Sequence, residues 1–109
     1  MQVSWKRCSN LNAQSILVAL ASHASELKKY CIVEIGLFGS WVNGRPRGRS
    51  DVDILVEFAP GMTTFDNFMD TKLFLEHLFH RKVDLVIKSA IKPVLAQRIL
   101  ESTRYVVIG

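Results

Sequence analysis

The sequence of 109 residues has few cysteines and no long run of hydrophobic residues, and each shortage excludes a class of protein. Cys8 and Cys31 have neither a CxxC spacing nor the number typical of a disulfide-rich protein, so we interpret them as reduced thiols. No segment approaches the roughly 20 apolar residues of a transmembrane helix. Lys6 and Arg7, ahead of the apolar run 16–21, resemble a secretory signal only faintly, because polar residues interrupt the approach. We therefore expect a cytoplasmic protein that does not enter the membrane.

The chain also lacks a strong excess of charge of one sign. Its 14 Lys and Arg against 10 Asp and Glu give a net charge of +4, and the basic residues are spread over several segments. This balance argues against nucleic-acid binding as the main role. With 49% hydrophobic and 22% charged residues and no internal repeat, the length leaves room for one core. We predict a single domain over residues 1–109.

Hydrophobic periodicity predicts helices that alternate with strands. The expected elements are a helix over 11–29, a strand over 32–38, a short helical turn and exposed loop over 40–50, a strand over 52–58, a helix over 65–80, a strand over 82–87, a helix over 93–101 and a strand over 105–108. Ser9 or Asn10 is the expected cap of the first helix, and Thr63 or Thr64 that of the helix over 65–80. The predicted fold class is α+β, close to α/β, with helices packed against a small mixed β-sheet.

The helix expected over 65–80 carries an apolar stripe wider than a narrow seam. Two interpretations stay open: the helix is unusually well buried, or it packs one flank in the core and offers the other to a partner. His77 and His80 have a helical spacing that could bind a metal. We interpret His80 instead as a residue that suits the helix C-terminus.

Two carboxylates stand at the start of the second strand. Asp51 and Asp53 are two residues apart, so on an extended strand both side chains point to one face. The two negative charges repel each other. Their arrangement becomes favourable when divalent cations lie between the carboxylates, as in two-metal phosphoryl and nucleotidyl transfer sites. Hard oxygen ligands suit magnesium. Alone, the pair is a weak signal, because acidic pairs also occur on solvated strand ends.

A glycine-serine turn precedes this strand. Gly39 allows a sharp turn or a close approach to a ligand, and Ser40 offers a hydroxyl and an N–H at the start of a helical turn, where phosphate binds well. Ser40 could equally be a simple helix cap. Arg45, Arg47 and Arg49 follow in the loop. Their guanidinium groups could neutralise a triphosphate, or they belong to a solvated basic loop.

Segment 39–53 consists of Gly-Ser, ten residues and then Asp-Val-Asp, which resembles the signature of the DNA polymerase β-like nucleotidyltransferases. The small size is similar to that of the minimal nucleotidyltransferases. Asp84, in an apolar strand, matches the third acidic residue of that family. One position departs: Asn43 stands where close relatives often have arginine. This departure puts in doubt any phosphate or substrate contact of that arginine.

The resemblance implies a polymerase β-like core that carries out nucleotidyl transfer. In it, Asp51 and Asp53 would bind two magnesium ions and the nucleoside triphosphate. Gly39 and Ser40 would contact its β- and γ-phosphates, assisted by one or more of the loop arginines. Asp84 would complete the metal site nearest the attacking hydroxyl and assist its deprotonation.

Minimal members of this family are often encoded beside a small helical protein of the HEPN class, and they resemble antitoxins that transfer AMP to a tyrosine of that partner. The resemblance therefore implies a type VII-like antitoxin, a protein adenylyltransferase that uses ATP and magnesium. Two alternatives stay open: a non-catalytic module that neutralises a helical partner by contact, and nucleotidyl transfer to a small molecule or nucleic acid. The nucleotide, the acceptor hydroxyl and a homo-oligomeric or hetero-oligomeric state also stay open.

Overall fold

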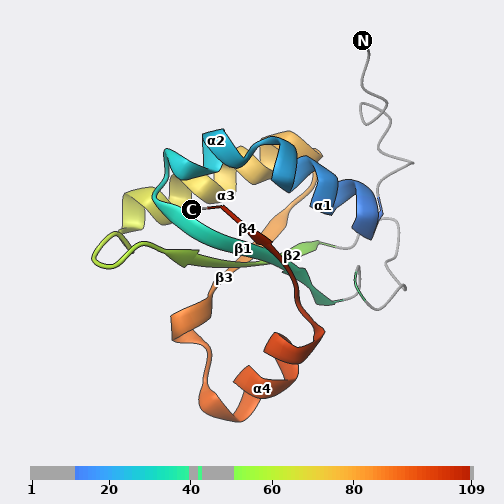
Figure 1. The fold of residues 1–109 in the computed structure, drawn as a ribbon, viewed down its shortest axis with the longest axis vertical. Coiled ribbons are helices and arrows are strands. Elements are labelled where there is room, and N and C mark those ends of the chain that lie inside the picture. The colour runs from blue at the N-terminus through green and yellow to red at the C-terminus, as the bar shows by residue number, and fades with distance from the viewer. Residues whose placement is uncertain (1–11, 40–41, 43–50, 109) are drawn as a thin grey trace.

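The computed structural model describes residues 12–39, 42 and 51–108, which form a four-stranded mixed sheet with helices on both of its faces (Figure 1). The elements are α1 (Ala13–Ser22), α2 (Ala24–Lys28), β1 (Ile32–Phe38), β2 (Val52–Phe58), α3 (Phe65–Phe79), β3 (Val83–Ile87), the 3₁₀ turn η4 (Lys88–Ala90), α4 (Pro93–Ser102) and β4 (Arg104–Val107). The strand order is β3-β2-β1-β4. β1 is antiparallel to β2 and β4, whereas β2 and β3 are parallel. The predicted mixed sheet with packed helices is therefore confirmed.

The first predicted helix is two helices. Asn12 caps α1: its Oδ1 accepts the N–H of Ser15 at 2.8 Å, while Ser15 Oγ accepts the N–H of Asn12 at 2.9 Å. The expectation of Ser9 or Asn10 as the cap was wrong, because this reciprocal pair already satisfies the helix start. The chain leaves helical geometry at His23, where φ is −105° and the ring Nδ1 lies 2.9 Å from a carbonyl oxygen of the preceding turn. This local bond ends α1 before α2 begins.

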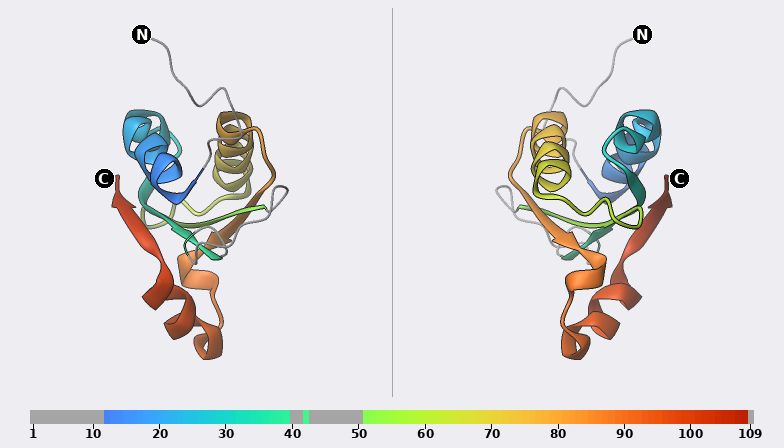
Figure 2. Two further views of the ribbon diagram at one scale, coloured as in Figure 1. Left: turned by 90° about the vertical axis from the view of Figure 1, so that its right-hand side faces the viewer. Right: turned by 90° about the vertical axis from the view of Figure 1, so that its left-hand side faces the viewer.

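Helices α1, α2 and α3 cover one face of the sheet, and α4 lies on the other side (Figure 2). Side chains alternate along the strands, so every second residue points to α1–α3 and forms the main core, as Ile35, Ile54 and Leu85 do. We call the opposite surface the α4 face. By the same alternation it carries Glu34, Gly36 and Phe38 of β1, Asp53, Leu55 and Glu57 of β2, Asp84 and Val86 of β3, and Tyr105 and Val107 of β4.

Helix α3 has nearly the predicted bounds. Thr64 caps it by accepting the N–H of Asn67 at 3.1 Å, as one of the two predicted caps. His80 follows the helix in the left-handed conformation, with φ 55°, which agrees with its interpretation as the end residue. Phe65 is 76% exposed and Leu73 57% exposed, so α3 packs one flank in the core and leaves apolar side chains on the other.

The remaining bounds differ from the predictions by a residue at most. β3 begins at Val83, α4 ends at Ser102, and β4 covers Arg104–Val107. Of the predicted turn and loop over 40–50, only Val42 is described, and its N–H donates to the carbonyl of Gly39 at 3.1 Å. Within the described part of the chain, no helix combines the length and apolar character needed to cross a membrane. A single domain over the whole chain stays a prediction.

Candidate active site

The carboxylate of Asp53 is directed to the α4 face by the alternation of β2. Its neighbours Val52 and Ile54 are fully buried in the main core, so the side chain between them must point the other way. Asp53 itself is half-buried. Asp51 lies just before the strand and is exposed. Because Val52 is anchored in the core, the local sequence alone determines that Asp53 faces away from α1–α3.

Strand β3 brings the third carboxylate beside Asp53. In the parallel ladder of β2 and β3, Asp53 is the register partner of Asp84. Paired strands lie about 4.8 Å apart, so two side chains on one face of such a pair are immediate neighbours. Asp84 is exposed, between the buried residues Val83 and Leu85. The sheet therefore collects on one surface two carboxylates that are 31 positions apart in sequence, and Asp51 lies at the edge of the same region.

Gly39 lies against Asp53 from the end of β1. Phe38, the last residue of β1, is the register partner of Asp53. Gly39 has φ +81°, which side chains other than glycine's rarely adopt, and a Cβ placed on it would overlap Oδ2 of Asp53 and lie 2.9 Å from its Cγ. Two independent constraints, conformation and space, thus require glycine where β1 turns past the carboxylate.

The charges around Asp53 disfavour its ionised form. Burial of the carboxyl group raises the pKa of Asp53 above 3.8, and the negative charges of Asp84 and then Asp51 raise it further. A cation between these groups would reverse the repulsion, and carboxylate oxygens are the donors that magnesium prefers. Among the residues that the structure describes, no three His, Cys, Asp or Glu side chains already form a metal-ligating group. The donor chemistry fits a divalent cation, and the carboxylates would have to turn to close around it.

Of the predicted phosphate-binding residues, only Gly39 lies in the described part of the chain. Ser40, Arg45, Arg47 and Arg49 lie outside the described residues, as does Asn43. The structure thus brings together Gly39, Asp53 and Asp84, and Asp51 stands two positions before Asp53. The roles assigned to all of these residues stay predictions.

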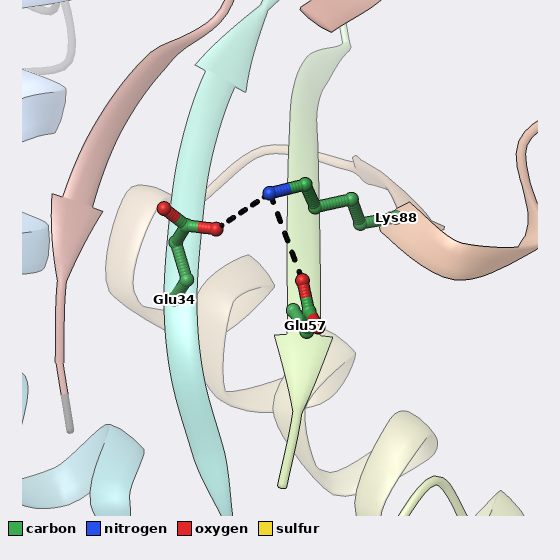
Figure 3. A network of polar contacts seen from close by, with 3 residues as sticks. All are labelled: Glu34, Glu57 and Lys88. Carbon is green, nitrogen blue, oxygen red and sulfur yellow. Dashed lines mark hydrogen bonds and ion pairs between the residues drawn. The ribbon is translucent and has the colours of Figure 1, made fainter. Parts of the chain in front are cut away.

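Sequence reasoning missed a second polar group on the α4 face (Figure 3). Lys88 Nζ lies 2.9 Å from Glu34 Oε1 of β1 and 3.7 Å from Glu57 Oε1 of β2, and 5.0 Å from the ring centroid of Tyr105. The pKa of Lys88 is raised, mainly by its hydrogen bond to Glu34. The available signal was the same alternation that identified Asp53, because Glu34 and Glu57 also interrupt apolar strands.

An apolar row separates this group from the carboxylates. Gly36, Leu55 and Val86 are register partners across β1, β2 and β3. Leu55 is only 1% exposed although it faces away from α1–α3. The α4 face therefore has three successive rows: the carboxylate row, the apolar row and the row of Lys88 with its two glutamates. The middle row keeps the charges of the other two apart.

The chain is similar to known proteins in both sequence and fold. The family model for the nucleotidyltransferase domain matches residues 19–106. The chain is 38% identical over 97 residues to protein adenylyltransferase MntA of Thermococcus cleftensis, covering 88% of this chain and 97% of that protein. A solved structure assigned as a minimal nucleotidyltransferase has a TM-score of 0.75 at 28% identity, covering 88% of this chain and 97% of that one. A toxin–antitoxin structure with AMP-PNP has a TM-score of 0.64 at 25% identity, covering 87% of this chain and 72% of that one.

Proposed function

Because the chain belongs to the nucleotidyltransferase domain family, as its resemblance predicted, we propose that it is an antitoxin that transfers AMP from ATP to a hydroxyl group of a partner protein. The partner is a helical toxin of the HEPN class, and the acceptor is a tyrosine. We include in the proposal a magnesium requirement, one domain over residues 1–109, and a cytoplasmic location, where ATP is supplied and the thiols of Cys8 and Cys31 stay reduced.

The register pairing of Asp53 with Asp84, with Gly39 against Asp53, is the observation that carries the proposal. Nucleotidyl transfer is favoured by cations at both the attacking and the leaving oxygen, because both oxygens carry negative charge in the transition state, and carboxylates are the ligands that would hold such cations. Asp53 and Asp84 on adjacent strands, with Asp51 two positions before Asp53, supply a set of such ligands. The raised pKa of Asp53 supports a site completed by cations.

In the proposed reaction, the tyrosine oxygen attacks the α-phosphorus of ATP. The new bond joins that oxygen to phosphorus, the bond to the bridging oxygen breaks, and pyrophosphate leaves. Asp51 and Asp53 would hold the magnesium ions, which would supply charge stabilisation for the triphosphate. Asp84 accepts the proton of the attacking hydroxyl. Gly39 and Ser40, with one or more of Arg45, Arg47 and Arg49, contact the phosphates that leave.

The comparisons support a protein acceptor. The relative from Thermococcus cleftensis is a protein adenylyltransferase, and the structure with AMP-PNP is a toxin–antitoxin complex. The exposed apolar side chains of α3, among them Phe65 and Leu73, support a second candidate, a module that neutralises its partner by contact alone. The two candidates differ in whether the carboxylates are required.

Labelled ATP separates the two candidates. We would incubate the chain with α-labelled ATP, magnesium and a HEPN-class partner protein, and measure both label on the partner and loss of toxicity. The variants are Asp51→Asn and Asp53→Asn, and Asp70→Asn is the matched control, an exposed carboxylate on α3. We expect transfer by wild type and by the control, and neither transfer nor neutralisation by the two site variants. Neutralisation by both site variants without any transfer would leave binding by contact as the function.

A further inference from the structure

Glu76 joins α3 to the strand that carries Asp84. Its Oε2 accepts a hydrogen bond from the N–H of Val83 at 3.0 Å, and the side chain is half-buried. Val83 is the first residue of β3 and immediately precedes Asp84. Leu75, next to Glu76 on α3, is fully buried in the main core. The hydrogen bond therefore ties the start of β3 to a helix that the core holds in place.

The hydrogen-bond pattern of β3 explains why Val83 needs such a partner. The carbonyl of Lys82 accepts the N–H of Val52 at 3.0 Å, so Lys82 directs its main-chain groups to β2. In a parallel ladder the direction alternates, so the N–H of Val83 points to the opposite side. β3 is at the edge of the sheet, and outward N–H groups on an edge strand have no ladder partner. The carboxylate of Glu76 provides a charge-assisted bond there.

The register of β3 relative to β2 determines where Asp84 lies. A slip of one residue would turn every side chain of β3 to the other face and carry Asp84 away from Asp53. Smaller fraying at the start of β3 would loosen Asp84 first, since it is the second residue of the strand. We propose that Glu76 is a positioning residue for AMP transfer, which keeps Asp84 beside Asp53 by fixing the N–H of Val83. This role rests on the proposed function of Asp84.

Three variants on α3 test the positioning role. Glu76→Ala removes the acceptor, whereas Glu76→Gln keeps a carbonyl oxygen at nearly the same place. Thr71→Val is the matched control, because the hydrogen bond of 2.7 Å that it removes, from Thr71 Oγ1 to the carbonyl of Asn67, lies within α3. We expect Glu76→Ala to raise the half-saturating magnesium concentration for AMP transfer about tenfold, the scale of lost support for a metal ligand. Glu76→Gln should restore most of that loss, and Thr71→Val should leave the magnesium requirement unchanged.

Amide hydrogen exchange provides a readout that needs neither metal nor activity. The N–H of Val83 should exchange at least tenfold faster in Glu76→Ala than in wild type, with an intermediate rate in Glu76→Gln. Equal exchange in wild type and Glu76→Ala, or the same rise in magnesium requirement in Thr71→Val, would overturn the positioning role. If wild type transfers no AMP, the proposed function fails, and the magnesium-induced rise in melting temperature decides the positioning role instead. A smaller rise in Glu76→Ala than in wild type supports that role, and an equal rise overturns it.

Discussion

Replacement of Gly39 by alanine tests how closely the turn after β1 packs against the site. The new Cβ would lie 2.9 Å from Cγ of Asp53, whereas non-bonded carbons prefer about 3.5–4.0 Å, so the carboxylate must withdraw by roughly 0.6–1.1 Å. A displacement of about 1 Å at a reacting centre can lower the rate about 100-fold. The positive φ of Gly39 adds a backbone cost of about 1–2 kcal/mol for alanine.

Gly61→Ala is the matched control for the backbone cost. Gly61 has φ +77°, close to that of Gly39, but nothing lies within 4 Å of the position that its Cβ would take. Both variants should therefore lose about 1–2 kcal/mol of stability, measured by denaturant unfolding, and their melting temperatures should fall by about 4–8 °C per kcal/mol. The rate of AMP transfer to the partner, measured well below the melting temperatures, should fall about 100-fold only in Gly39→Ala. Full activity of Gly39→Ala, or an equal loss in Gly61→Ala, would refute the reasoning.

Asp53→Asn should stabilise the metal-free protein at pH 7, because it removes a half-buried charge repelled by Asp84 and Asp51; unchanged stability in denaturant unfolding would contradict this. Because the pKa of Asp53 is raised in the folded state, the protonated carboxyl group contributes stability that is fully present below the unfolded value of 3.8 and is lost as pH rises through the folded pKa. The gain in unfolding free energy from Asp53→Asn should therefore grow as pH rises above 3.8. Magnesium should raise the melting temperature of wild type more than that of Asp53→Asn, as differential scanning fluorimetry can measure, and equal shifts would exclude Asp53 as a ligand. Leu75→Ala should cost about 2–5 kcal/mol in denaturant unfolding, because Leu75 is fully buried in the main core; a loss below 1 kcal/mol would show that the site collapses without a cavity.

Local sequence signals predicted the elements well where the physical cause is local. The bounds of β1 and β2 agree with the predictions, and α3 begins where Thr64 can cap it. The first helix was predicted less well, because the side-chain bond of His23 to its own helix has no effect on the hydrophobic period. The same limitation explains why Asn12 was missed as the cap, since several polar residues precede α1 and the period cannot choose among them.

The candidate site was predictable in part. The spacing of Asp51 and Asp53, and the isolated acidic residue Asp84, were visible in the sequence and led to the nucleotidyltransferase resemblance. The contribution of Glu76 was not visible, because a glutamate near the end of a helix is ordinary and its bond partner is a main-chain N–H. Lys88 was also missed, since its partner Glu34 lies 54 positions away.

The chemistry follows directly from the residues: which carboxylates are present, and, through the period of two, that Asp53 points away from its buried neighbours. The pairing of Asp53 with Asp84 and the place of Gly39 against Asp53 became visible in the folded chain. Side-chain direction follows from each residue's own backbone, whereas strand pairing depends on how α3, which connects β2 to β3, packs against the sheet (Figure 2) and on which apolar surfaces the whole chain can bury together.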